Sequence, residues 1–217
     1  MNGLHILAPT WLEYRAARRT LPAAGVTRAG VQLARWHGAR EGSSVVVCGL
    51  AGALTPSLRP GTILVPAQVG LPDGRVMRCD PALVHALAAA ARALGFQPDT
   101  GPLLTARSLV VGAARDDWAR RGFVAADMET GLLAARNLRV ATVRVVLDSP
   151  DHGISRKWLR PADAALRPAL WGELFWLCLV AYPYALRAAA VLKGGLERYQ
   201  GAALTPTPWL TGPPIPS

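Results

Sequence analysis

Short apolar runs alternate with longer amphipathic segments along most of the chain. Continuous runs rich in Val, Ile and Leu predict strands covered on both faces, and apolar residues every three to four positions predict helices. The runs predict strands at 4–9, 43–54, 61–71, 74–77, 123–128 and 139–149, and a strand followed by a loop within 100–112. The helical pattern predicts helices at 11–21, 28–38, 80–95, 113–122 and 129–138. This alternation predicts an α/β protein with a mixed, mostly parallel central sheet.

The C-terminal part differs in character, because residues 166–196 are strongly apolar and rich in aromatic side chains. The uninterrupted apolar run, 174–186, is too short to span a bilayer as a helix. Two interpretations stay open: a buried helix packed on the sheet, or an interfacial segment that touches a membrane. We expect one domain over 1–200, which includes a helical extension at 166–200, followed by a Pro-rich tail at 201–217.

The chain has 217 residues, 51% of them hydrophobic, and a formal net charge of +10. Its arginines are scattered, with no run of five or six cations and no signature of a nucleic-acid-binding module. We therefore interpret the charge as a solvated basic surface and expect no nucleic-acid partner. Phosphate-bearing ligands and an anionic membrane surface stay open as partners.

The three cysteines, Cys48, Cys79 and Cys178, form no CxxC pair and no Cys/His cluster. This spacing predicts neither a disulfide framework nor a metal site. The N-terminal "MNGLHILAP" lacks the basic and apolar regions of a signal peptide. The sequence thus predicts a cytoplasmic protein, with the inner face of the membrane as an alternative place if the C-terminal segment is interfacial.

Three groups of residues that could bind a ligand or take part in a reaction follow or end predicted strands: Gly49–Gly52, Asp127–Glu129 and Asp148. In α/β sheets, ligands bind beyond the carboxyl ends of the strands. We therefore expect these groups to converge, although they are far apart in the sequence.

Two segments resemble the hallmarks of the nucleoside phosphorylase superfamily. "VVVCGLAGALTPSLRPGTILVPAQV" is similar to its glycine-rich strand and loop, and "AADMETGLLAARNLRVATVRVVLDS" is similar to its acidic helix start followed by a strand that ends in an aspartate. The resemblance covers residues 27–155. It implies a three-layer α/β/α fold and an enzyme related to purine and uridine phosphorylases, methylthioadenosine/S-adenosylhomocysteine nucleosidases, futalosine hydrolases and hopanoid-associated enzymes.

The resemblance also implies roles for individual acids. Asp148 matches the aspartate that protonates a purine, and Glu129 matches the glutamate that accepts hydrogen bonds from the ribose 2′- and 3′-hydroxyls. Met128 matches a methionine that packs on the sugar, Asp127 an acidic position of varying role, and Glu13 the glutamate that activates water. No metal and no cofactor are expected.

The chemistry of these residues agrees with the resemblance. Cleavage of an N-glycosidic bond needs one group that protonates the departing nucleobase and another that binds the sugar hydroxyls. Each acid also has a plainer interpretation. Asp148 precedes Ser and Pro, as in ordinary turns, Glu129 could complement a helix dipole, and Glu13 could be a surface glutamate of a helix. The remaining predicted substrate contacts come from the glycine-rich segment and from the 105–111 loop: Gly49, Leu50, Ala51, Gly52, Arg107 and Leu109.

Departures from the family favour water over phosphate as the nucleophile. Val47 and Leu50 stand where phosphorolytic members carry an arginine and a serine, and neither side chain can bind an anion. We therefore expect a hydrolase acting on an adenine nucleoside. A phosphorylase, which is a glycosyltransferase using inorganic phosphate as co-substrate, is the alternative, with Arg28, Arg107 or Arg156 as the cation.

The segment between the first strand and Gly30 is shorter than in typical members of the family, and the C-terminal part is apolar. Both features favour the hopanoid-associated branch. The substrate would then be a lipid-linked nucleoside such as adenosylhopane, and the pathway hopanoid biosynthesis. Membrane contact would then run through residues 170–192, and a homodimer is implied by the resemblance. A catalytically silent nucleoside-binding relative and a basic membrane-associated scaffold are the competing hypotheses.

Overall fold

The computed structural model describes residues 3–151 and 171–204, with side chains described for 3–151 and 179–201. The strands are β1 (Leu4–Ala8), β2 (Val26–Arg28), β3 (Ser44–Ala53), β4 (Ile63–Leu64), β5 (Gln68–Gly70), β6 (Val76–Arg78), β7 (Leu103–Thr105), β8 (Ala125–Asp127) and β9 (Arg139–Asp148). The helices are α1 (Trp11–Thr20), the 3-10 turn η1 (Val31–Leu33), α2 (Pro81–Ala93), α3 (Ala113–Arg120), α4 (Thr130–Ala134) and α6 (Trp171–Leu204).

All nine strands join one mixed sheet, in the order β2-β1-β3-β8-β7-β5-β6, with β9 paired to β3 and β4. The pairs β1–β2, β1–β3, β3–β9, β5–β7 and β7–β8 are parallel. The pairs β3–β8, β4–β9 and β5–β6 are antiparallel. This confirms the predicted α/β class and the mostly parallel sheet.

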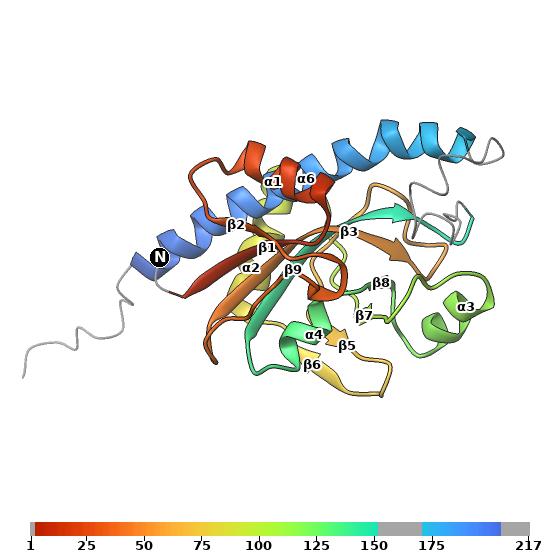
Figure 1. Cartoon of the computed structure of the whole chain (residues 1–217), viewed down its shortest axis with the longest axis horizontal. Coiled ribbons are helices and arrows are strands. Elements are labelled where there is room, and N and C mark those ends of the chain that lie inside the picture. Colours follow the sequence, from red (N-terminus) through yellow and green to blue (C-terminus); the bar gives the residue numbers. More distant parts are fainter. Residues whose placement is uncertain (1–2, 152–170, 205–217) are drawn as a thin grey trace, which may run out of the picture.

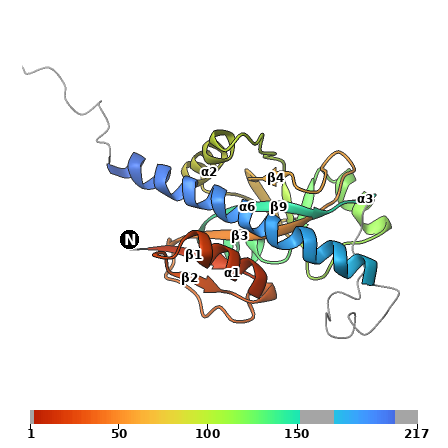
Figure 2. The same ribbon diagram turned by 90° about the horizontal axis from the view of Figure 1, so that it is seen from above.

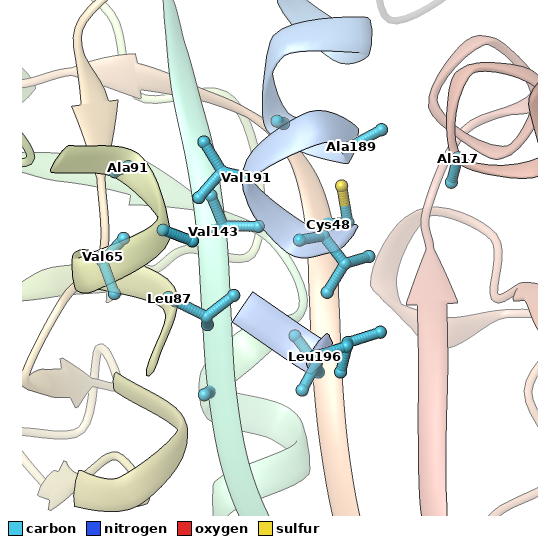
Figure 3. Packing of buried hydrophobic residues seen from close by; sticks show 14 of the residues in the cluster. Ala17, Cys48, Val65, Leu87, Ala91, Val143, Ala189, Val191 and Leu196 are labelled. Atoms are coloured by element: carbon cyan, nitrogen blue, oxygen red, sulfur yellow. The ribbon is translucent and has the colours of Figure 1, made fainter. Parts of the chain in front are cut away.

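Helices α1, α2 and α6 cover one face of the sheet, and α6 runs across it (Figures 1 and 2). Figure 3 shows the cluster that they form with β3 and β9, in which Ala17, Leu87 and Val191 come from the three helices. The opposite face is covered by the short α4 and by η1, through Leu133 and Leu33. The two faces give the three layers that the resemblance implies.

The predicted helix at 28–38 is wrong, because only the single turn η1 forms there. Gln32 and Leu33 have φ angles of 55° and 60°, and an L-residue helix cannot continue through the left-handed region. Leu33 is buried against the far face of the sheet, and the backbone N–H of Gln32 is bonded to Glu129, 97 positions along the chain. Long-range contacts therefore override the local helical pattern.

The predicted strand at 61–71 is two short strands, since β4 pairs with β9 whereas β5 pairs with β6 and β7. Pro66 lies between them and has no N–H for a sheet ladder. The predicted helix at 129–138 is also shorter, and α4 gives way to a turn in which Asn137 is left-handed, with φ 56°.

The C-terminal segment forms α6, which is buried against the sheet and α2 along 181–196. That stretch fits the buried-helix interpretation. Leu179 is 57% exposed, and the side chains of 170–178 lie outside the described ones, so membrane contact through 170–192 stays a prediction. Within the described residues, no helix is long and apolar enough to cross a membrane.

Cys48 and Cys79 are both buried, and only Cys48 lies in an apolar run of the sequence. Burial raises the pKa of Cys48 to about 12, and it does the same for Cys79. A thiol that stays protonated at neutral pH is a poor nucleophile and metal ligand. The side chain of Cys178 lies outside the described residues.

Candidate active site

A buried arginine on β9, Arg144, is the centre of the candidate site. It is 1% exposed, and its Nη2 lies 2.5 Å from Asp127 Oδ2 and 3.3 Å from Glu129 Oε2. Its Nη1 donates to the carbonyl oxygen of Leu50 at 3.3 Å. A buried cation is tolerated only with such partners, and here one positive charge pairs with two carboxylates. Arg144 is not among the site residues predicted from the sequence, although a charge inside a buried strand is itself an unusual signal.

Asp127 supports the site by holding other residues in place. Its Oδ1 accepts from Thr105 Oγ1 at 2.6 Å, and its Oδ2 accepts from the backbone N–H of Thr130 at 3.1 Å and from the Thr130 hydroxyl. Together with Arg144 these donors engage both carboxylate oxygens. Asp127 therefore orients Arg144 and the start of α4, and its predicted contact with the substrate stays a prediction.

Glu129 is 4% exposed and is held at both carboxylate oxygens. Its Oε1 accepts from the Gln32 N–H at 3.1 Å, and its Oε2 faces Arg144. Burial raises the pKa of Glu129 to about 7, and the charge of Arg144 acts in the opposite direction. The carboxylates of Asp127 and Glu13 add to the rise, and the Gln32 N–H opposes it. The group therefore titrates near neutral pH, as expected for a functional carboxyl.

This raised pKa predicts a pH-dependent stability. Because the folded protein binds the Glu129 proton more tightly than the unfolded chain, the stabilisation is complete below about pH 4.5 and is lost as the pH rises through about 7. Urea unfolding of wild type and Glu129→Gln between pH 4.5 and 7.5 measures it. We expect the free energy of unfolding of wild type, relative to the variant, to fall across this window. A constant difference would contradict the assigned titration.

Glu13 is buried, at 4% exposure, so the interpretation as a surface helix glutamate is wrong. It forms a capping box with Thr10, whose N–H and hydroxyl both donate to Glu13 Oε2 at 2.7 Å. The other oxygen, Oε1, accepts from the backbone N–H of Leu50 at 2.7 Å. The cap thus aims the first acid of α1 at the glycine-rich part of β3, next to Arg144.

Gly49 provides the space for this carboxylate, since a Cβ there would lie 2.3 Å from Glu13 Oε1 and 2.9 Å from Arg144 Nη1. We predict that Gly49→Ala destabilises the fold by about 1–3 kcal/mol, because it overpacks a buried charged cluster. Gly25→Ala is the matched control, because a Cβ there meets nothing within 4 Å. Equal unfolding midpoints for the two variants in urea would contradict the close approach.

Asp148 ends β9 and is 7% exposed. It lies opposite Gly52, where the β3–β9 register shifts, and a Cβ on Gly52 would be 2.7 Å from Asp148 Oδ1. The guanidinium of Arg115, from the first turn of α3, forms an ion pair with the other oxygen. Asp148 is therefore placed at the other end of the same glycine-rich stretch, three residues along β3 from Gly49, or roughly 10 Å.

The three predicted groups do lie close together in the fold, but not because all of them lie beyond the carboxyl ends of parallel strands. Gly49–Gly52 lie inside β3 and not beyond its end, and β8, which leads to Asp127, runs antiparallel to β3. The groups meet because β9 and β8 both pair with the carboxyl half of β3.

The other predicted contacts surround this stretch. Ala51 is buried and Leu50 half-buried in β3, and Met128 is half-buried directly before Glu129. In the loop after β7, Leu109 is half-buried and Arg107 exposed. The Arg107 carbonyl accepts a hydrogen bond from the Gln32 side chain, which ties this loop to η1.

Neither Val47 nor Leu50, the two positions at which the resemblance implies anion-binding groups in phosphorolytic enzymes, carries a polar side chain. Val47 is fully buried in the apolar cluster of the far face. Of the proposed cations, Arg28 is half-buried, Arg107 is exposed and Arg156 lies outside the described residues. No group of three His, Cys, Asp or Glu side chains within 3–151 and the described part of α6 could hold a metal ion.

Comparisons with known proteins agree with this architecture. A family model described as "Phosphorylase superfamily" matches residues 22–165. The futalosine hydrolase of Helicobacter pylori strain 26695 superposes with a TM-score of 0.65 at 13% identity, over 90% of this chain and 97% of that one. S-adenosylhomocysteine nucleosidase from Streptococcus pyogenes, in complex with 5-methylthiotubericidin, gives 0.67 at 17% identity, over 91% and 98%.

The 5′-methylthioadenosine/S-adenosylhomocysteine nucleosidase of Helicobacter pylori gives a TM-score of 0.65 at 13% identity, over 90% of this chain and 97% of that one. No curated protein matches the chain significantly. At these identities the solved structures show a shared fold, whereas the family model spans well over half of the sequence. The chain belongs to the phosphorylase superfamily, as an enzyme of the nucleosidase or nucleoside phosphorylase type.

Proposed function

We propose that the protein cleaves the N-glycosidic bond of an adenine nucleoside and that water is the nucleophile. The observation that carries this proposal is the arrangement along Gly49–Gly52. Glu13, Glu129 and Arg144 gather at one end of this stretch, and Asp148 lies at the other. Bond cleavage leaves positive charge on the sugar and negative charge on the base, so a carboxylate is needed at one end and a proton donor at the other.

Glu129 is the proposed residue that binds the ribose hydroxyls. When ionised it can accept hydrogen bonds from two vicinal hydroxyls, and its charge favours the oxocarbenium-like transition state. Its pKa of about 7 means that neutral to slightly alkaline pH favours this form.

Glu13 is the proposed base that activates water. Its Oε2 accepts from both the N–H and the hydroxyl of Thr10, whereas its Oε1 accepts from the Leu50 N–H and keeps a second lone-pair direction for a water molecule. Asp148 is the proposed acid that donates a proton to the leaving purine. The backbone of Gly49–Gly52 and the loop carrying Arg107 and Leu109 would contact the nucleoside between them.

Product analysis separates hydrolysis from phosphorolysis. Hydrolysis gives the free sugar at a rate independent of inorganic phosphate, whereas phosphorolysis gives a sugar 1-phosphate at a rate that rises with phosphate. We expect the first result, since buried Val47 and half-buried Leu50 offer no anion-binding group. Formation of sugar 1-phosphate would favour the phosphorylase alternative.

The substrate that we propose is a lipid-linked adenine nucleoside such as adenosylhopane. Trp11, at the start of α1, is 56% exposed, and Leu179, in the first half of α6, is 57% exposed. Exposed apolar side chains of this kind suit contact with the cytoplasmic face of a membrane through the part of the apolar segment 170–192 that does not pack on the sheet and α2. Adenine release from adenosylhopane in vesicles tests this. Cleavage of methylthioadenosine without any cleavage of the lipid nucleoside would contradict it.

We further propose a homodimer, as the resemblance implies. Sedimentation equilibrium of the full chain measures the molar mass, and a strictly monomeric active enzyme would contradict this part of the proposal.

A further inference from the structure

The ion pair between Arg115 and Asp148 links the proposed acid to a residue that lies outside the sugar end of the site. Both side chains are almost completely buried, with 6% and 9% exposure. Arg115 comes from α3, which follows the loop 106–112, and Asp148 ends β9. The pair therefore joins the loop expected to contact the base to the residue expected to protonate it.

The guanidinium of Arg115 is fixed at two points. Its Nε donates to the carbonyl oxygen of Val110 at 3.0 Å, and its Nη2 donates to Asp148 Oδ2. Its Nη1 is buried and has no hydrogen-bond partner among the described residues. A buried donor without a partner costs stability, and Arg144 has one as well within the described part of the chain, at its Nε; what fixes the direction of the Arg115 guanidinium is its two bonds, to Val110 and to Asp148.

The backbone of β3 leaves room for this arrangement. A Cβ on Gly52 would lie 2.7 Å from Asp148 Oδ1 and 4.0 Å from Arg115 Nη2. The register shift beside Gly52 brings it opposite Asp148. The two oxygens of Asp148 are thus in different surroundings, Oδ2 on the guanidinium and Oδ1 against Gly52.

We propose that Arg115 is a positioning residue that assigns the transferable proton to Oδ1 of Asp148 and stabilises the carboxylate left behind; this rests on the proposed function. A guanidinium has donors only, so the oxygen that it binds must act as an acceptor. The Oδ1–H bond breaks as a ring nitrogen of the base takes the proton, and the electrons of the C1′–N bond go to the base. The charge that develops on Asp148 faces Arg115, which lowers the barrier to transfer.

The test compares two substrates that differ in their need for a proton. Adenine leaves with protonation, whereas the nitrophenolate of 4-nitrophenyl β-D-ribofuranoside leaves as a stable anion. We expect Arg115→Met to lower kcat on the adenine nucleoside by about 10- to 100-fold, the rate equivalent of one hydrogen bond to a charged group. We expect less than about a threefold change on the nitrophenyl riboside and in KM, because the sugar end is untouched.

Two further variants serve as controls. Arg120→Met carries the same change on the same helix, at an exposed side chain paired with Asp117, and should leave both rates unchanged. Arg115→Lys keeps the charge but cannot reach the Val110 carbonyl and Asp148 with one planar group, so it should restore part of the rate on the adenine nucleoside. Thermal unfolding of each variant confirms that it is folded at the assay temperature.

A double-mutant cycle tests whether Arg115 acts through Asp148. In Asp148→Asn the further change Arg115→Met should cost little, because the acid is already absent. Equal loss on both substrates, no loss on either, or additive losses in the cycle would overturn the role of Arg115 alone. A wild type that cleaves neither substrate would overturn the proposed function and this role with it.

Discussion

Arg144→Met is expected to destabilise the protein by about 3–5 kcal/mol, since removal of one partner leaves buried charges uncompensated. Arg144 is the cation that faces Asp127 at 2.5 Å and Glu129 at 3.3 Å, and all three side chains are at most 5% exposed. Without it the two carboxylates repel one another in a poorly solvated space. Urea unfolding at pH 7.5, where the carboxylates are ionised, measures the loss.

A control variant and a change of pH show whether the loss of stability in Arg144→Met comes from the buried charge cluster. Arg120→Met removes an arginine of the same kind from an exposed ion pair and should change stability little. In Arg144→Met the destabilisation should shrink as the pH falls from 7.5 to 5.5, because protonation of Glu129 removes one of the unpaired charges. A loss below about 1 kcal/mol at pH 7.5 would contradict the central role of Arg144 in the cluster.

Asp148→Asn is expected to lower the rate of adenine release by about 10²- to 10⁴-fold, which is the usual contribution of a general acid. Asparagine keeps the size of the side chain and can still accept a hydrogen bond from Arg115, but it has no proton to transfer. Binding of the nucleoside should therefore survive, and the loss should appear in kcat. Initial rates of both proteins at saturating nucleoside measure it, and an unimpaired variant would contradict the assignment.

Much of the fold was predictable because its signals are local. The helix α2 carries its own start, with Asp80 bonded to the N–H groups of Ala82 and Leu83 and Pro81 at the first position. The strands β3 and β9 are continuous apolar runs and form the buried centre of the sheet. Such elements need no knowledge of distant residues.

The parts that were missed depend on distant contacts. The segment around Gln32 has a helical pattern, but its backbone is held in a left-handed turn by Glu129 and by packing on the sheet. In the sequence Arg115 is an ordinary residue of an amphipathic helix, and only the fold brings it to Asp148, 33 positions away. A resemblance in short motifs was enough to predict the acids Glu13, Glu129 and Asp148. The arginines that pair with two of these acids, Arg144 and Arg115, could be recognised only from the three-dimensional structure.

The most direct test is an assay of the purified protein with an adenine nucleoside in the absence of inorganic phosphate, with the release of adenine measured by chromatography. We expect free adenine and free sugar in equal amounts, at a rate that Asp148→Asn lowers by at least about a hundredfold. No adenine from adenosine, methylthioadenosine or adenosylhopane, with or without phosphate, would contradict it. Release at the same rate by wild type and Asp148→Asn would do so as well.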